Sequence, residues 1–309
     1  MPLSRRAAVL LLLFADKHGN LRVLLTLRAS GMSSYSGQVA LPGGKADTLS
    51  ETAFDTARRE AWEEVGLPSE NSKMPAPFRV EHLCELPAQL SATEQVVRPC
   101  VAFLHTDSSS SSSSSGKTGI GPGLETKEES PMMIPKLNVA EVAAVFSAPL
   151  HRFLSSRVEG NAKESLIRHE SKWQTWNGGR WLMHNFFVPK GSVRDDDDDD
   201  DSSSSSSSGR RNEQLPQQVE KDGEEYYKVW GMTARILIDS ARIAYDEDPE
   251  FEHTKEFGEE AMVQCLIRRG RLTGERQIGA KMPRGQVEKE TGAAVSKALD
   301  DNGGRGTKL

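Results

Sequence analysis

Residues 41–67 constrain the fold of this chain more than any other segment, because they contain both the start and the stop of one helix. Thr48 and Glu51 have the spacing of a capping box, in which each side chain satisfies a free backbone N–H. No proline or glycine interrupts the chain between Thr48 and Gly66. Gly66 stands at the position favoured for a left-handed C-cap. The pattern therefore predicts a helix that begins near Thr48 and ends at Gly66.

The predicted helix carries an apolar stripe and an acidic face. The apolar residues recur at helical spacing: Phe54, Ala57, Ala61 and Val65. Glu60, Glu63 and Glu64 are spaced i, i+3 and i+4, so their carboxylates share one face within a turn. Three like charges this close repel, whereas hard oxygen ligands of this kind suit Mg²⁺ or Mn²⁺ beside substrate phosphates. The alternative is an ordinary solvated acidic face.

The loop ahead of this helix favours the metal site over the solvated face. Pro42 is followed by Gly43 and Gly44, and paired glycines allow backbone carbonyls to approach a cation or phosphate closely. One short segment contains the glycine loop, the helix cap, the three carboxylates and the C-terminal glycine of the helix. This combination is more specific than an isolated pair of glutamates. We therefore expect a cation site where the loop meets the helix.

These residues resemble the Nudix box, which reads Gly, five residues, Glu, seven residues, then Arg-Glu-apolar-x-Glu-Glu-x-Gly-apolar. The matching positions are Gly44, Glu51, Arg59, Glu60, Ala61, Glu63, Glu64, Gly66 and Leu67. The match has one departure, because six residues instead of five separate Gly44 from Glu51. The resemblance implies an α/β fold, the Nudix α/β/α sandwich around a mixed β-sheet, with the box helix on one face.

With this extra residue, the loop resembles that of the Nudix subgroup that hydrolyses coenzyme A, which reads Pro-Gly-Gly-Lys-x-Asp. This chain has that loop at residues 42–47, and residues 24–29 begin the upstream signature of the subgroup, Leu-Leu-Thr-x-Arg-[Ser/Ala]. Two positions depart from the signature: Ser33 replaces an Arg, and Leu41 replaces a Phe. The missing Arg removes one possible phosphate contact. The subgroup resemblance implies hydrolysis of coenzyme A or its derivatives to 3′,5′-ADP and 4′-phosphopantetheine.

The resemblance also implies roles for individual residues. Glu60, Glu63 and Glu64 are expected as ligands of Mg²⁺ or Mn²⁺, together with a backbone carbonyl of Gly43 or Gly44. Glu63 and Glu64 are also expected in catalysis, with Glu63 as a ligand or as the base that deprotonates the attacking water. Arg59 is expected to orient the site by pairing with a carboxylate such as Glu51.

Substrate contacts are expected from Arg28, Lys45, Gly43 and Gly44, although Arg28 and Lys45 could equally be surface charges; Arg98 is a weaker candidate. The tryptophans at 173, 176 and 181 could stack on adenine, but aromatic residues more often belong to a core.

Low-complexity runs divide the chain. Residues 108–115 are all Ser, and Asp195 to Asp201 precede seven further Ser residues. Such segments bury too little apolar surface to offset the entropy of ordering, so disorder is expected over 107–131 and 191–223. The net charge is −6, and removing the seven charges of the Asp run leaves +1, so acidity does not identify a partner. We expect a Nudix domain over 1–248 and a mostly flexible tail over 249–309.

Strands are expected at residues 7–14, 21–28, 78–86, 96–104 and 180–188, with a further strand within 137–149. A strand entering a helix is expected over 226–245, and short helices near 151–156 and 261–268. Arg5 and Arg6 before 7–14 could also begin a signal peptide, but the apolar run is short and lacks a small-residue cleavage site.

Three scattered cysteines indicate core residues in a reducing compartment, and no apolar run is long enough for a membrane span. Thr307-Lys308-Leu309 differs from the peroxisomal Ser-Lys-Leu signal only in its first residue, so an import receptor is an expected partner, with cytoplasm as the alternative location. Nucleic-acid binding has no support.

Two other functions fit parts of the sequence. The same box serves house-cleaning hydrolases of NADH or nucleoside triphosphates, although the signature at 24–29 favours coenzyme A. A Nudix domain can also be a non-catalytic binding module, but such domains typically lose the carboxylates that stand here at Glu60, Glu63 and Glu64.

Overall fold

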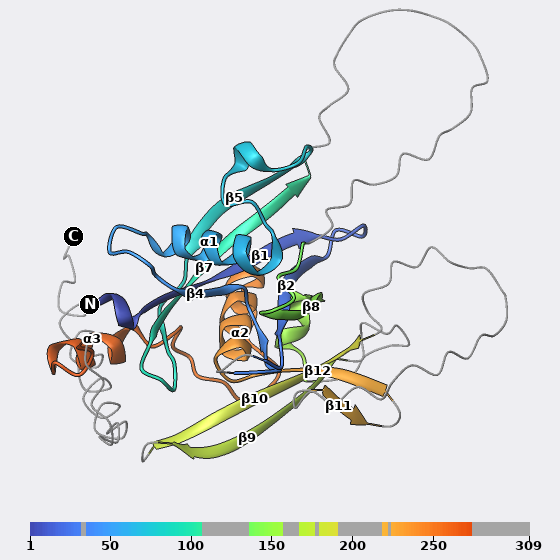
Figure 1. Ribbon diagram of the computed structural model, residues 1–309. Coiled ribbons are helices and arrows are strands. Elements are labelled where there is room, and N and C mark those ends of the chain that lie inside the picture. The colour runs from blue at the N-terminus through green and yellow to red at the C-terminus, as the bar shows by residue number, and fades with distance from the viewer. Residues whose placement is uncertain are drawn as a thin grey trace, which may run out of the picture.

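The computed structural model describes residues 1–31, 35–106, 136–156, 167–176, 179–190, 218–221 and 224–273. The chain folds around an eight-stranded sheet (Figure 1). Its strands are β1 (Arg6–Ala15), β2 (Leu21–Arg28), β3 (Val39–Ala40), β4 (Gly43–Lys45), β5 (Phe78–Glu85), β6 (Gln89–Leu90), β7 (Val96–Thr106) and β8 (Val142–Pro149). The helices are α1 (Ala53–Val65), α2 (Gly231–Tyr245) and α3 (Glu260–Arg268), with 3₁₀ turns η1 (Leu3–Arg5), η2 (Asn71–Lys73) and η3 (Leu150–Leu154).

The sheet is mixed, as expected from the sequence. Strand β1 pairs in parallel with β7 and antiparallel with β2 and β4. The order along the sheet is β3-β2-β1-β7-β5, with β4, β6 and β8 paired beside this path. The short strand β4 is the segment that carries Gly43 and Gly44, so its pairing with the central strand β1 fixes the glycine loop in the sheet.

Strand β1 is apolar on both faces because a helix covers each of them. Leu10 and Leu12 share a buried cluster with Ala57 and Ala61 of α1. Leu11 and Leu13 belong instead to the cluster that includes residues 236–238 of α2. Side chains alternate between the faces of a strand, so one run of leucines serves both clusters. The expected α/β/α arrangement is confirmed (Figure 1).

A second sheet shares the α2 side of the molecule and was not predicted. Its order is β11-β12-β10-β9, with β9 (Arg168–Trp176), β10 (Gly179–Pro189), β11 (Gln218–Lys221) and β12 (Glu224–Trp230), all antiparallel. The segments of β10 and β12 were expected as strands. β9 is polar along most of its length and shows no apolar alternation. β11 falls inside the span 191–223 expected to be disordered, so that expectation was wrong for residues 218–221.

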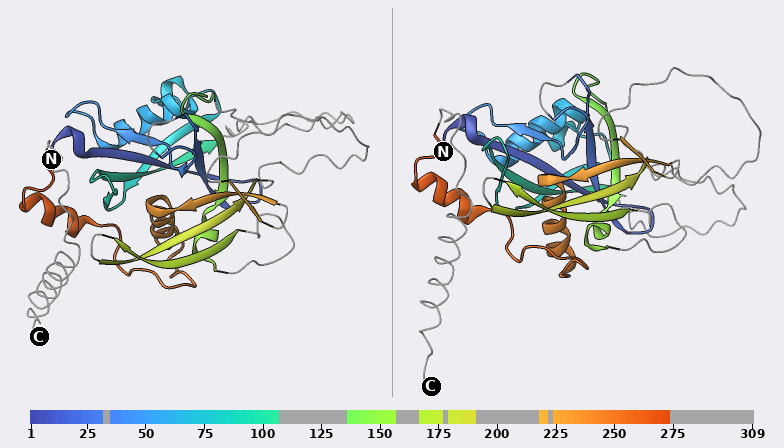
Figure 2. Two further views of the ribbon diagram at one scale, coloured as in Figure 1. Left: turned by 60° about the horizontal axis from the view of Figure 1, so that its bottom comes forward. Right: turned by 90° about the horizontal axis from the view of Figure 1, so that it is seen from below.

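The fold continues past residue 248, where the tail was expected to begin. Phe251 stacks on His169 with ring centroids 3.8 Å apart. In α3, Val263 and Leu266 are buried against Leu90 in a separate apolar cluster. Figure 2 shows α3 beside the N-terminus, where the Arg5 side chain donates to the Thr273 carbonyl at 2.9 Å. The expected boundary therefore falls inside a packed region, and packing reaches at least Leu272.

Several expectations fall on residues outside the described ranges: the disorder of 107–131 and of 191–217, and the import tripeptide at 307–309. In the part of the chain that the structure describes, no helix has the length and apolar character needed to cross a bilayer.

Candidate active site

Helix α1 begins four residues later than the sequence predicted. Its N-cap is Thr52, whose hydroxyl accepts from the Asp55 N–H while the Asp55 carboxylate accepts from the Thr52 N–H. The pair expected at Thr48 and Glu51 does not cap the helix. The Thr48 hydroxyl accepts weakly from the Glu51 N–H at 3.3 Å, and the Glu51 carboxylate accepts from the Asp47 N–H and the Thr56 hydroxyl. Two capping patterns lie next to each other in the chain, at 48–51 and 52–55, and the second starts the helix.

The end of α1 is where the sequence placed it. Gly66 adopts the left-handed conformation, with φ of 72°, and its N–H reaches the carbonyls of Ala61 and Trp62. The expected apolar stripe faces the sheet, because Ala57, Ala61 and Val65 are buried against β1 and β7. This packing fixes the rotation of the helix, and so it determines which glutamates face the glycine loop.

The two loop glycines allow the backbone of β4 to lie close to α1 and to β1. Gly43 has a φ of 154°, and a Cβ there would lie 2.4 Å from the Ala8 carbonyl oxygen of β1. A Cβ on Gly44 would lie 2.5 Å from the carboxyl group of Glu60. The Gly43 N–H also donates to Glu64 Oε2 at 3.1 Å. Glycine at both positions lets the strand backbone contact two carboxylates of α1 directly.

Glu64 is a buried carboxylate, and Glu60 is half-buried beside it. The Glu64 side chain is only 6% exposed. Burial raises the pKa of Glu64 to about 7, although the Gly43 N–H and Arg28 act in the opposite direction. Burial also raises the pKa of Glu60, against the lowering effect of Arg59. Burial therefore disfavours the charged form of both carboxylates, and a bound cation would stabilise that form.

Glu63 is the most exposed of the three expected ligands and shares Arg59 Nη1 with Glu60. Its side chain is 46% exposed and pairs with Arg59 Nη1 at 3.1 Å, because Arg59 lies one helical turn earlier. Among the residues that the structure describes, no three His, Cys, Asp or Glu side chains form a group ready to hold a metal ion. Glu60 and Glu64 are the pair that faces the loop.

Arg59 connects the helix to the loop through several contacts. Its Nε lies 3.1 Å from Glu51 Oε1, its Nη1 lies 3.2 Å from Glu60 Oε1, and its Nη2 donates to the Lys45 carbonyl at 2.7 Å. Burial alone would lower the pKa of Arg59, but the hydrogen bond to Glu51 and the charges of Glu60 and Glu51 raise it. The expected pairing with Glu51 is present.

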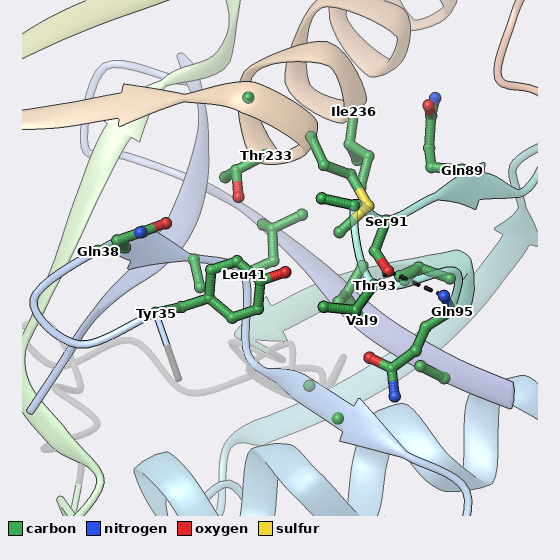
Figure 3. Close-up of a pocket in the computed structure, with 18 of the residues that line it drawn as sticks. Val9, Tyr35, Gln38, Leu41, Gln89, Ser91, Thr93, Gln95, Thr233 and Ile236 are labelled. Atoms are coloured by element: carbon green, nitrogen blue, oxygen red, sulfur yellow. Dashed lines mark hydrogen bonds between the residues drawn. The ribbon is translucent and has the colours of Figure 1, made fainter. Parts of the chain in front are cut away.

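A cavity of about 1020 Å³ opens beside this corner (Figure 3). Strands β1, β3, β4 and β6 and helices α1 and α2 all contribute to its walls. Its lining includes these expected site residues: Arg28, Gly43, Gly44, Lys45, Glu60 and Glu64. Glu63, Arg59 and Arg98 are absent from its lining.

The basic candidates occupy different environments. Arg28 Nη1 lies 3.5 Å from Glu64 Oε1, and within the described residues its buried Nε has no hydrogen-bond partner. Lys45 is exposed at the pocket margin. Arg98 instead pairs with Glu260 of α3 at 3.0 Å, so it holds the C-terminal helix and not the pocket. Of these three candidates for substrate contact, Arg28 is the one that lies beside Glu64.

Sequence reasoning missed several residues that line the cavity. Tyr35 is a half-exposed ring at the pocket, with an unusual positive φ of 56° (Figure 3). Gln38, in the loop before β3, and Gln89, on β6, also line the cavity. The tryptophan of the lining is Trp230, whereas Trp173 is 44% exposed and does not line the cavity. No local pattern marks these residues, because tertiary packing alone brings them together.

Residues 4–90 match the NUDIX domain family. The chain is 31% identical over 266 residues to "Peroxisomal coenzyme A diphosphatase 1, peroxisomal" from Saccharomyces cerevisiae, covering 79% of this chain and 70% of that protein. It is also 31% identical to "Nudix hydrolase 15, mitochondrial" from Arabidopsis thaliana, covering 80% of this chain and 61% of that protein. A solved Nudix hydrolase structure from M. smegmatis aligns with a TM-score of 0.31 and 21% identity, over 48% of this chain and 73% of that one.

The glycine loop, the capped helix and the paired carboxylates lie within or directly beside the matched span, and the similarity to the yeast protein extends over most of both chains. The chain therefore belongs to the Nudix hydrolases, a family of enzymes that act on pyrophosphate bonds.

Proposed function

We propose that this chain hydrolyses the pyrophosphate bond of coenzyme A or its derivatives, releasing 3′,5′-ADP and 4′-phosphopantetheine or its acylated form. The observation that carries the proposal is the corner where Glu60 and Glu64 face Gly43 and Gly44 at the wall of a large cavity. The 31% identity to a yeast coenzyme A diphosphatase supports this substrate in particular.

Nudix hydrolases generally use divalent metal ions, and the residues of the corner suit Mg²⁺ or Mn²⁺. Glu64 is buried and Glu60 half-buried, and burial raises the pKa of both carboxyl groups, so they offer hard oxygens whose charged form a cation would stabilise. They would hold the ion together with a backbone carbonyl of Gly43 or Gly44. When bound, such an ion would neutralise charge on the pyrophosphate and make a water molecule more acidic.

The chain's own residues complete the chemistry. Arg28, beside Glu64, and Lys45, at the pocket margin, would bind phosphate oxygens and keep the phosphorus in line with the attacking water. Glu63 is exposed and would serve as a base or as a ligand after releasing Arg59. Arg59 is a positioning residue, because it ties Glu60 and Glu51 to the backbone of the loop.

A substrate panel tests the proposal. Purified protein is incubated with Mg²⁺ or Mn²⁺ and, separately, coenzyme A, acyl-coenzyme A, oxidised coenzyme A, NADH and nucleoside triphosphates, and kcat/KM is measured for each. We expect a coenzyme A compound to have the highest value. A preference for nucleoside triphosphates or NADH would assign a house-cleaning role instead. Absence of turnover on every compound would favour a binding module.

The compartment is a separate question. The names of the relatives give peroxisome for the yeast protein, and mitochondrion and chloroplast for two Arabidopsis proteins, of which this chain spans 61% and 59%. These names do not select one compartment. Fusion of the full chain to a fluorescent protein at its N-terminus, with and without Thr307-Lys308-Leu309, measures whether that tripeptide directs peroxisomal import.

A further inference from the structure

Tyr35 places an exposed aromatic ring in the cavity. The residue lines the pocket and is 46% exposed. Figure 3 shows the ring projecting from the loop before β3 toward the middle of the pocket. Among the residues that the structure describes, the ring stacks on no other aromatic ring and the hydroxyl has no hydrogen-bond partner. A large apolar ring is therefore accessible to a ligand in the cavity.

The backbone holds Tyr35 in a conformation that bulky residues rarely adopt. Its φ is 56°, in the left-handed region where the side chain crowds the backbone. The loop keeps this conformation through the Tyr35 carbonyl, which accepts from the Gln38 N–H at 3.2 Å. Strain of this kind costs free energy, and it is concentrated at sites that bind ligands. The observed φ therefore makes the ring a candidate for ligand binding.

The loop that carries Tyr35 is joined directly to the carboxylate corner. Arg28 closes the loop, because its N–H donates to the Gln38 carbonyl at 3.0 Å and its carbonyl accepts from the Gly37 N–H at 3.1 Å. The Arg28 side chain reaches the other way, and its Nη1 lies 3.5 Å from Glu64 Oε1. One short loop therefore contributes both a cation beside the carboxylates and an aromatic ring to the same cavity.

The chemistry of the ring selects a flat aromatic ligand group. The described lining contains one other aromatic residue, Trp230, and Lys228 Nζ lies 5.5 Å from the centroid of its ring. Tyr35 has no such partner. Every nucleobase has a π-face that stacks on an exposed aromatic side chain. A saturated chain needs no aromatic ring, since aliphatic side chains such as Val9 and Leu41 also line the cavity.

We propose that Tyr35 is a specificity-determining residue whose ring stacks on the adenine base of the substrate. The inference rests on the proposed function, because adenine is the one aromatic group of coenzyme A. Stacking on Tyr35 would hold the nucleotide half in the cavity while the pyrophosphate lies beside Arg28 and Glu64. The pantetheine arm is the rival group for contact with the ring.

Three ligands separate contact with the base from contact with the rest of the substrate. Calorimetry measures the binding of 3′,5′-ADP, of base-free ribose 3,5-bisphosphate and of 4′-phosphopantetheine, each with Mg²⁺. We expect Tyr35→Leu to weaken 3′,5′-ADP about tenfold, which is the scale of one lost stacking contact, and to leave the other two ligands unchanged. Tyr35→Phe keeps the ring and should keep the wild-type affinity for 3′,5′-ADP.

Two further variants control the experiment, and a thermal melt checks the folding of each. Tyr35→Asn also removes the ring but suits a left-handed φ, so it should weaken 3′,5′-ADP even if Tyr35→Leu does not fold. Trp173→Leu removes a ring that is 44% exposed outside the cavity lining, and should leave all three affinities unchanged.

Several results would overturn the proposal. These are unchanged binding of 3′,5′-ADP in Tyr35→Leu and Tyr35→Asn, an equal loss for the base-free ligand, a loss confined to 4′-phosphopantetheine, or an equal loss in Tyr35→Phe. Failure of the proposed function would look different, since wild type would then cleave no coenzyme A compound in the substrate panel.

Discussion

The absence of a side chain at Gly44 leaves the space that the Glu60 carboxyl group occupies. The space where a Cβ would stand on Gly44 lies 2.5 Å from the Glu60 carboxyl group. Any larger residue must therefore push this carboxylate away from the loop. Glu64 is tied to the same loop through the Gly43 N–H at 3.1 Å. The positions of both carboxylates depend on backbone atoms, which makes the corner sensitive to small displacements.

Gly44→Ala should therefore lower catalysis with a small effect on stability. No left-handed φ is required at Gly44, so the backbone tolerates alanine, but Glu60 must shift. Because a displacement of about 1 Å can cost a hundredfold in rate, we expect kcat to fall by about that factor. Steady-state kinetics on coenzyme A measure the loss. Gly31→Ala is the matched control, since a Cβ there meets nothing within 4 Å. Equal kcat in both variants would contradict the account.

At the residue scale, the sequence suggested which residues to consider for the site, but not how their side chains are oriented. Glu60, Glu64, Gly43, Gly44 and Arg28 all line one cavity. The i, i+4 spacing of Arg59 and Glu63 permits their ion pair, but the sequence alone does not show whether Glu63 forms it. The pocket residues Tyr35 and Gln89 come from segments far apart in the chain, so no local pattern could predict that they meet.

At the scale of the element, α1 has two neighbouring capping patterns, of which one is used. Thr52 and Asp55 exchange hydrogen bonds at the first turn, whereas Thr48 and Glu51 shape the preceding turn. The Glu51 carboxylate pairs with Arg59 and therefore does not cap the N-terminus of the helix. Two adjacent matches to the capping pattern cannot be ranked from the sequence without knowing which group Arg59 contacts.

Thr52→Ala should destabilise the protein by about 1 kcal/mol, the usual cost of losing an N-cap side chain. Urea unfolding followed by circular dichroism measures the free energy of unfolding. Thr48→Ala is the matched control and should cost less than about 0.5 kcal/mol, because its hydroxyl holds only an exposed turn. A larger loss for Thr48→Ala than for Thr52→Ala would mean that the helix starts earlier.

At the scale of the whole molecule, the sheets and helices around the cavity come from nearly the full described length. The segment 249–273 belongs to this framework, since Phe251 stacks on His169 and Glu259 accepts from the Leu90 N–H at 2.7 Å. Polar composition suggested a tail here, because the apolar contacts are few and widely spaced. Strand β9 was not predicted for the same reason, because its residues are mostly polar. It pairs with β10 through backbone hydrogen bonds.

Leu266→Ala should reduce the free energy of unfolding by about 2–4 kcal/mol, because Leu266 is 2% exposed in the cluster that joins α3 to β6. Ile267→Ala, one residue further along the same helix, is the control and should cost less than about 1 kcal/mol, since Ile267 is 40% exposed. Chemical denaturation of the full chain compares the two. Equal small losses would show that α3 does not contribute to the fold.

The central proposal is that Glu60 and Glu64, beside the glycine loop, carry metal-dependent cleavage of coenzyme A. The most direct measurement is product formation from coenzyme A with Mg²⁺, comparing wild type, Glu64→Gln and the exposed control Glu70→Gln. Glutamine keeps an oxygen for the Gly43 N–H but removes the charge, so the Glu64 variant should melt near the wild-type temperature. We expect its formation of 3′,5′-ADP and 4′-phosphopantetheine to fall at least about a hundredfold, with Glu70→Gln unaffected. Wild-type turnover by a folded Glu64→Gln protein would contradict the account.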